Sequence, residues 1–205
     1  MPIQKFLQEI FSWTKSILVA LLVAIIVSAF IIQPFTVSGS SMEPTFFGGD
    51  SSEEDLTGDR VMIFKSSYLL GQMPEYNDVV IIDSRISRER TIQDNFLDNP
   101  IIYKLLGNSD QENLWIKRVI GKAGDKLEFK NGKVFRNGTE LNEKYVDEEM
   151  EFPFETITIP EGHIYVMGDN RNGSTDSRTI GPIPDDHVIG EVFFRFYPFD
   201  KMNTF

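Results

Sequence analysis

The sequence WIKRVIG, residues 115–121, places one lysine among apolar residues, several of them β-branched. Such residues favour β-strands, and a short apolar run of this kind is typical of a strand in a protein core. Lys117 is therefore expected on a strand that enters the core, where burial disfavours the charged ammonium and lowers its pKa. From spacing alone, the pattern also allows a salt-bridged lysine at the end of a strand.

A serine-rich stretch, SGSSMEPT at residues 38–45, follows a long apolar run. A serine hydroxyl is a weak nucleophile at neutral pH and needs a neighbouring base. The chain has two histidines, His163 and His187, and neither lies in a sequence that suggests a catalytic triad. The pattern therefore favours Ser41 as nucleophile with neutral Lys117 as its base, although an isolated Ser-x-x-Pro is also typical of a turn.

Length and composition favour one globular domain with an anchor. The chain has 205 residues, 41% of them hydrophobic, which is enough for one sizeable core. It has no cysteine, so disulfides, thiolate metal sites and a cysteine nucleophile are excluded. Its net charge of −11 argues against nucleic acid as a partner, because phosphate binding requires a basic surface.

The apolar run near the N-terminus is long enough to cross a bilayer, which takes about 20 residues. We predict a transmembrane signal-anchor helix over residues 16–35, ended by Pro34. The alternative is a cleaved secretory signal, for which Val27-Ser28-Ala29 is a tolerable cleavage site. Residues 30–32 continue the apolar run past that site and argue against cleavage.

The charges that flank the apolar run predict its orientation. Lys5 and Lys15 precede the run, whereas acidic residues at positions 50–55 follow it. Positive charge is enriched on the cytoplasmic side of membrane segments. Residues 1–15 are therefore expected in the cytoplasm, and residues 36–205 form an extracytoplasmic domain.

The remaining pattern is mostly that of β-strands. Residues 60–64 follow a Gly-Asp turn and are predicted to form a strand. Residues 78–83 are predicted to form a second, buried strand, because they consist of four apolar residues with an aspartate at each end. Asn131-Gly132 predicts a hairpin over residues 127–135. Further strands are predicted at residues 156–160, 164–167 and 190–198. Residues 84–113 are polar around a small apolar patch and are expected to be an insertion, whose role the sequence leaves open.

A third stretch, GDNRNGSTDSR at residues 168–178, completes a set of motifs. The apolar anchor, Ser-Met-x-Pro-Thr, Gly-Asp, Lys-Arg-Val-Ile-Gly and this stretch occur in an order that resembles the bacterial type I signal peptidases. The resemblance extends to about Phe194. It implies a mostly β, signal-peptidase/repressor-protease-like β-barrel domain on one N-terminal transmembrane helix.

The resemblance also implies roles for single residues. Ser41 would attack the substrate carbonyl to form an acyl-enzyme, and Lys117 would be the general base. Ser174 would hydrogen-bond and orient the lysine, while Asp176 and Arg178 would form a structural ion pair. The activity implied is that of a membrane-bound serine endopeptidase with a Ser/Lys dyad.

Two features of the binding site follow from the same resemblance. The backbone amide of Ser41 would contribute to the oxyanion hole. Many relatives carry a serine where this chain has Gly39, so a backbone group at Gly39 is the possible second donor. The substrate would be extended along strands near the site, with Thr36 and Val37 beside its backbone and small residues in the A-x-A pattern before the cut.

The partners implied are secretory precursor proteins and the lipid bilayer, with no nucleic acid, no metal and no cofactor. The location implied is the bacterial inner membrane, crossed once. A calcium loop is the competing interpretation of residues 169–180, but Ile180 stands where a bidentate glutamate is required. A self-cleaving repressor-type protease would need a DNA-binding domain, and a non-catalytic binding module would be expected to lose Ser41, Lys117 or Ser174.

Overall fold

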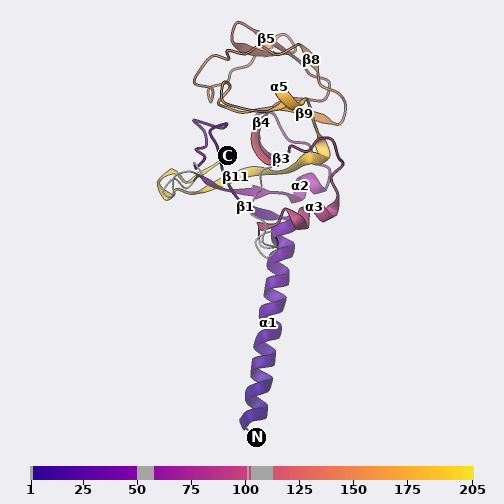
Figure 1. Ribbon diagram of the computed structural model, residues 1–205, viewed down its shortest axis with the longest axis vertical. Helices are drawn as coiled ribbons and strands as arrows, with labels where there is room; N and C mark the ends of the chain where they lie inside the picture. Colours follow the sequence, from indigo (N-terminus) through magenta and orange to yellow (C-terminus); the bar gives the residue numbers. More distant parts are fainter. Residues whose placement is uncertain (1, 50–57, 101, 103–112) are drawn as a thin grey trace.

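The computed structural model describes residues 2–49, 58–100, 102 and 113–205. One long helix, α1 (Pro2–Phe30), extends from a β-rich domain, and the two ends of the described chain lie far apart (Figure 1). The prediction of a mostly β domain on a single N-terminal apolar helix is confirmed. The acidic residues at positions 50–55 and most of the second half of the predicted insertion lie outside the described residues.

Helix α1 differs in its bounds from the predicted anchor. It begins at Pro2, because residues 3–15 contain no glycine or proline that would interrupt a helix, and it ends at Phe30 rather than at Pro34. Pro34 lies instead within strand β1 (Ile32–Thr36). Strand β1 is the edge strand of its sheet, where the missing N–H of a proline is tolerated. Residues Ile3–Phe30 are long and apolar enough to cross a membrane.

The larger sheet has eight strands, all of them in antiparallel pairs. Its order is β1, β2 (Arg60–Phe64), β11 (Val188–Tyr197), β3 (Val79–Asp83), β4 (Leu114–Lys122), β9 (His163–Met167) and β10 (Ile183–Pro184), with β12 (Asn203–Thr204) paired to β11. Every residue of β3 is buried, as the apolar run predicts. Strand β4 lies between β3 and β9 and is therefore held on both edges.

The core has apolar clusters on both faces of this sheet. Val79 and Ile81 belong to one cluster, whereas Val80 and Ile82 belong to the other. This follows from the two-residue period of a strand, which sends successive side chains to opposite faces. Lys117 pairs in register with Val80 and so lies on the face of Val80.

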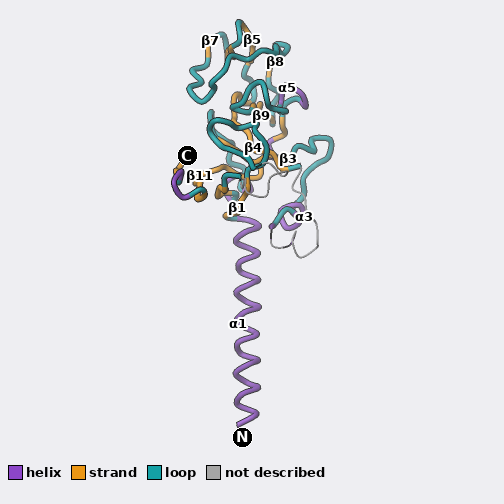
Figure 2. The backbone as a smooth tube through the Cα atoms, turned by 60° about the vertical axis from the view of Figure 1, so that its left-hand side comes forward, coloured by secondary structure: helices purple, strands orange, loops and turns teal. Residues whose placement is uncertain are grey.

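A smaller sheet continues the chain after β4. Its order is β7 (Thr139–Glu140), β6 (Lys133–Arg136), β5 (Lys126–Lys130) and β8 (Ile157–Thr158). Strands β5 and β6 form the predicted hairpin, and both turn residues, Asn131 and Gly132, have positive φ. This sheet lies at the end of the domain far from α1 (Figure 2). It packs on the larger sheet through a third apolar cluster centred on Leu127, Ile120 and Met167.

Short helices complete the described chain. They are α2 (Ser66–Leu69), α3 (Ile92–Leu97), α5 (Ser177–Ile180) and the 3-10 turns η1 (Asp185–His187) and η2 (Phe199–Lys201). Helix α3 belongs to the predicted insertion and lies beside the end of α1 in both views (Figures 1 and 2). Helix α5 follows directly on the loop that contains Ser174.

Truncating Leu127 to alanine should destabilise the domain by about 2–5 kcal/mol, because this fully buried side chain joins the two sheets. Leu70→Ala is the matched control. Leu70 is 87% exposed, so its truncation should change stability by less than about 0.5 kcal/mol. Urea unfolding of both variants in detergent, followed by circular dichroism, measures the difference, and equal losses would contradict the assigned packing.

Candidate active site

The structure brings Ser41 and Lys117 together from segments that lie far apart in the sequence. Lys117 Nζ donates a hydrogen bond to Ser41 Oγ at 2.8 Å and a second one to the carbonyl oxygen of Ile116 at 3.0 Å. Lys117 is 4% exposed, whereas Ser41 is half-buried. A lysine that is largely withdrawn from water thus faces a serine that solvent still reaches, which is the arrangement a nucleophile and its base require.

Burial sets the protonation of Lys117. Desolvation disfavours its charged form and lowers its pKa from 10.5 to about 8. The charge of Asp176 opposes this shift, while that of Arg178 adds to it. A lysine with this pKa is partly neutral near neutral pH and can accept a proton.

Backbone contacts hold the segment around Ser41 from both sides. Before the serine, Val37 N donates to the carbonyl oxygen of Asp59 at 2.8 Å. At the serine itself, Asn170 N donates to the carbonyl oxygen of Ser41 at 3.1 Å, and Asn170 Nδ2 donates to that of Ser40 at 3.2 Å. The sequence interpretation missed Asn170, because nothing in its local pattern identifies a contact that crosses 129 residues.

Glycines permit two close approaches at the site. A Cβ on Gly168 would collide with Ser174 Oγ and with the carbonyl oxygen of Ser41. A Cβ on Gly48 would collide with the backbone of Gly39, which has a φ of 71°. The loop that carries Ser174 and the loop that carries Ser41 therefore both lie against glycine backbone.

Ser174 lies next to the site but does not make the predicted contact. Its Oγ is buried, and its interaction with the carboxylate of Asp176 contributes to the lowered pKa of that group. The two hydrogen bonds of the Lys117 ammonium go to Ser41 and Ile116 instead. The position of Ser174 close to the backbone of Gly168 and Ser41 is nevertheless within the site.

Asp176 and Arg178 form the predicted ion pair, with 2.8 Å between Arg178 Nη2 and Asp176 Oδ2. Asp176 is fully buried, accepts the N–H of Gly168 at 2.9 Å and caps helix α5 through the N–H of Arg178. Burial alone would raise the pKa of Asp176, but the hydrogen bonds and charge of Arg178 outweigh it and lower the pKa. The pair thus ties the 168–178 loop to the start of α5.

A second buried ion pair was not expected from the sequence. Arg118 donates from Nε and Nη2 to the two carboxylate oxygens of Asp169, at 2.8 and 2.6 Å. Thr45 Oγ1 donates to the same carboxylate at 2.5 Å. This pairing also weakens the calcium interpretation, and the described residues contain no group of three or more His, Cys, Asp or Glu side chains that could hold a metal ion.

Lys65 is a second buried lysine, which the sequence pattern did not identify. Lys65 is fully buried at the end of β2, and its Nζ donates to Gln33 Oε1 at 3.0 Å. Burial, with the charge of Arg90, lowers its pKa to about 8. Burial therefore does not distinguish the two lysines, whereas the contact of Lys117 Nζ with Ser41 Oγ does.

Thr36 and Val37 lie where strand β1 leads into the segment of Ser41. Thr36 is exposed at the end of β1, whereas Val37 is buried in the core. Strand β1 pairs with β2 alone among the described strands and is the first strand of the sheet. Its outer edge is thus a place where an extended peptide could add as a further strand.

Comparison with known proteins gives consistent matches over most of the chain. The family described as "Signal peptidase, peptidase S26" matches residues 10–197. Signal peptidase IB of Staphylococcus aureus (strain COL) is 30% identical over 212 residues, covering 95% of this chain and 93% of that protein. Thylakoidal processing peptidase 1, chloroplastic, of Arabidopsis thaliana is 32% identical over 191 residues, covering 92% of this chain, which spans 49% of that relative's length. A crystal structure of a signal peptidase I from Enterococcus faecalis V583 matches with a TM-score of 0.41 and 22% identity, covering 59% of this chain and 97% of that one.

Lys117→Met should stabilise the protein in a pH-dependent way. The pKa of Lys117 is about 8 in the folded protein, against an ordinary value of 10.5 that applies to the unfolded chain. Between about pH 8 and pH 10.5, more unfolded than folded chains carry the lysine proton. The free energy of unfolding of the parent therefore increases with pH in this range. The stability of the variant minus that of the parent should therefore fall by about 3 kcal/mol from about pH 7 to about pH 11. Urea unfolding across this range measures it, and a difference independent of pH would contradict the lowered pKa.

Proposed function

The chain belongs to the signal peptidase family, peptidase S26, and we propose that its Ser41 and Lys117 perform the family's reaction, the removal of signal peptides from secretory precursors. The observation that carries this assignment is the 2.8 Å contact between Ser41 Oγ and the nitrogen of a buried lysine. Among the described side chains, the two histidines lie elsewhere: His163 contacts the carbonyl oxygen of Glu161, and His187 contacts Asp186 and Arg85.

The first half of the reaction forms an acyl-enzyme. Neutral Lys117 takes the proton from Ser41 Oγ as the oxygen attacks the carbonyl carbon before the cut. When the tetrahedral intermediate collapses, the lysine ammonium gives this proton to the departing amine of the mature protein. The carbon–nitrogen bond breaks, and the signal peptide stays esterified to Ser41.

The second half regenerates the enzyme. Lys117, now neutral again, takes a proton from a water molecule that attacks the ester carbonyl, and it then returns this proton to Ser41 Oγ. The negative charge of both intermediates falls on the carbonyl oxygen. We assign its stabilisation to the backbone amide of Ser41, with a backbone group at Gly39 as the second donor; one such donor is typically worth about 3 kcal/mol.

Ser174 is proposed to orient the lysine. What supports this role is the position of its buried Oγ, which lies against the backbone of Gly168, where the carbonyl oxygen of Ser41 also approaches. Asp176 and Arg178 are proposed to act indirectly, by holding the 168–178 loop in place. Their role is structural.

The substrate is proposed to bind in an extended form along the outer edge of β1. Thr36 and Val37 would contact its backbone, and small residues in the A-x-A pattern would precede the cut. Helix α1 is proposed to cross the bacterial inner membrane, with residues 1–15 in the cytoplasm and residues 16–30 as the membrane-spanning part of the anchor. Because residues 32–36 form β1, the extracytoplasmic catalytic domain begins directly after the helix. The short path from α1 through β1 to Ser41 supports this placement, because it keeps the nucleophile near the membrane surface.

Ser41→Ala and Lys117→Met should each lower cleavage of a secretory precursor by at least about a thousandfold, because nucleophile and base act as one unit. Ser38→Ala and Ser40→Ala are the matched controls and should stay within a few-fold of the parent. Cleavage in detergent or lipid, with circular dichroism to verify folding, measures all four. Activity that survives Ser41→Ala but is lost in Ser38→Ala or Ser40→Ala would move the nucleophile.

Cleavage should depend on pH through Lys117. Since only neutral lysine accepts the serine proton, kcat/KM should rise with pH to a plateau, with an apparent pKa of about 8. Lys65 has a similarly lowered pKa but lies away from Ser41, so Lys65→Met should keep the same inflection. An inflection that disappears in Lys65→Met would show that the titrating group is Lys65 rather than Lys117.

A further inference from the structure

Helix α3 has its acidic residue and its asparagine turned inward, whereas Ile92 and Leu97 are exposed on the outward face together with Gln93. Asp94 and Asn95 are buried, whereas Ile92 is 72% and Leu97 52% exposed. At about 100° per residue, residues 94, 95 and 98 share one face of the helix, and residues 92, 93, 96 and 97 share the opposite one. A helix on a water-soluble domain normally has the reverse arrangement.

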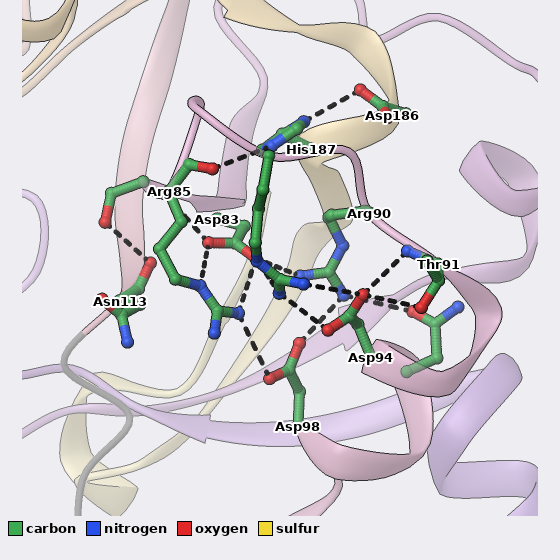
Figure 3. A network of polar contacts seen from close by, with 12 residues as sticks. Asp83, Arg85, Arg90, Thr91, Asp94, Asp98, Asn113, Asp186 and His187 are labelled. Carbon is green, nitrogen blue, oxygen red and sulfur yellow. Dashed lines mark hydrogen bonds and ion pairs between the residues drawn. The ribbon is translucent and has the colours of Figure 1, made fainter.

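The inward face is held by charge. Asp94 pairs with Arg88 at 2.7 Å, and Asp98 pairs with Arg90 at 2.9 Å. Arg90 in turn reaches the fully buried Asp83 at the end of β3, at 2.7 Å. Figure 3 shows Asp94 and Asp98 pointing from the helix into this cluster of arginines. Rotating α3 to bury its apolar face would break these pairs and leave buried charges unpaired, which is costly.

The outward face of α3 is continuous with the apolar surface of α1. Phe96, on that face, packs edge-on against Phe30 with ring centroids 4.9 Å apart. Asn99, just after the helix, donates from Nδ2 to the carbonyl oxygen of Ile25 at 3.4 Å. Helix α3 therefore lies at the level of the last turns of α1, which belong to the span long and apolar enough to cross a membrane.

The length of α1 places this level at the bilayer. The uncharged part of α1, Ser16–Phe30, covers about 22 Å at 1.5 Å per residue. The hydrocarbon core is about 30 Å thick, so a bilayer crossed by α1 extends up to the end of the helix, even when Lys15 reaches back to the opposite surface. An apolar helix face beside Phe30 is then in contact with lipid rather than with water.

We propose that α3 is a second membrane contact, which lies in the interfacial layer of the bilayer with Ile92 and Leu97 against lipid and its carboxylates turned to the arginine cluster. This inference rests on the proposed placement of α1 across the membrane. It assigns a role to the first half of the insertion: α3 fixes the tilt of the catalytic domain over the lipid. Two contacts, α1 and α3, define an orientation that one helix alone leaves free.

The test uses the full chain in vesicles of phosphatidylcholine and phosphatidylglycerol. Because the protein has no cysteine, single cysteines at Ile92, Leu97 and the neighbouring Gln93 accept a polarity-sensitive fluorophore without background labelling. Thr139→Cys, exposed on β7 far from α1, is the aqueous control (Figure 2). Leu22→Cys, exposed on α1, reports whether the anchor itself lies in lipid.

We expect blue-shifted emission at positions 92, 93 and 97, with strong quenching by lipids that carry a nitroxide near the head group and weak quenching by aqueous iodide. Thr139→Cys should show the opposite pattern, and Leu22→Cys should be quenched by nitroxides deep in the lipid acyl chains.

Emission at the three α3 positions that matches Thr139→Cys would overturn the inference. So would protection from both quenchers, which would show that protein, either another segment of this chain or a second copy, covers the helix. Failure of Leu22→Cys to sense lipid would overturn the anchor and the inference with it, whereas failure at α3 alone leaves the anchor intact.

Discussion

The burial of the Lys117 ammonium beside Ser41 is the constraint on which the rest of the domain depends. A lysine accepts a proton near neutral pH only if water is kept away from it, and burial lowers its pKa to about 8. Three separate parts of the chain meet here: β4 carries the lysine, the segment after β1 carries the serine, and the 168–178 loop contacts that segment through Asn170.

The sequence was sufficient for features that depend on neighbouring residues. The strand around Lys117, the buried strand β3 and the hairpin at Asn131-Gly132 all follow from local pattern and turn chemistry. The pairing of Ser41 with Lys117 was predicted because a serine nucleophile needs a base and the histidines offered none. The resemblance to signal peptidases supplied the loop of Asp176 and Arg178, whose partners lie close in the sequence.

Features that depend on partners far along the chain were not predictable in this way. Pro34 was expected to end the helix, but β2 pairs with residues 32–36 and makes them an edge strand. The buried pairs of Arg118 with Asp169 and of Lys65 with Gln33 join residues 51 and 32 positions apart, and no local pattern marks them. Helix α3 shows the same difficulty in another form, because an inward-facing carboxylate is understandable only when the arginines around it are known.

The junction between α1 and β1 has a mechanical consequence. Helix α1 ends at Phe30 and β1 begins at Ile32, while the carbonyl oxygen of Ile31 accepts the N–H of Lys65, so no flexible linker separates the helix from the sheet. The height of Ser41 above the lipid is then set by how far α1 sinks into it. Where α1 spans a bilayer, a thicker or thinner membrane would raise or lower the whole domain as a rigid body, and membrane thickness becomes part of the geometry that determines where a precursor is cut.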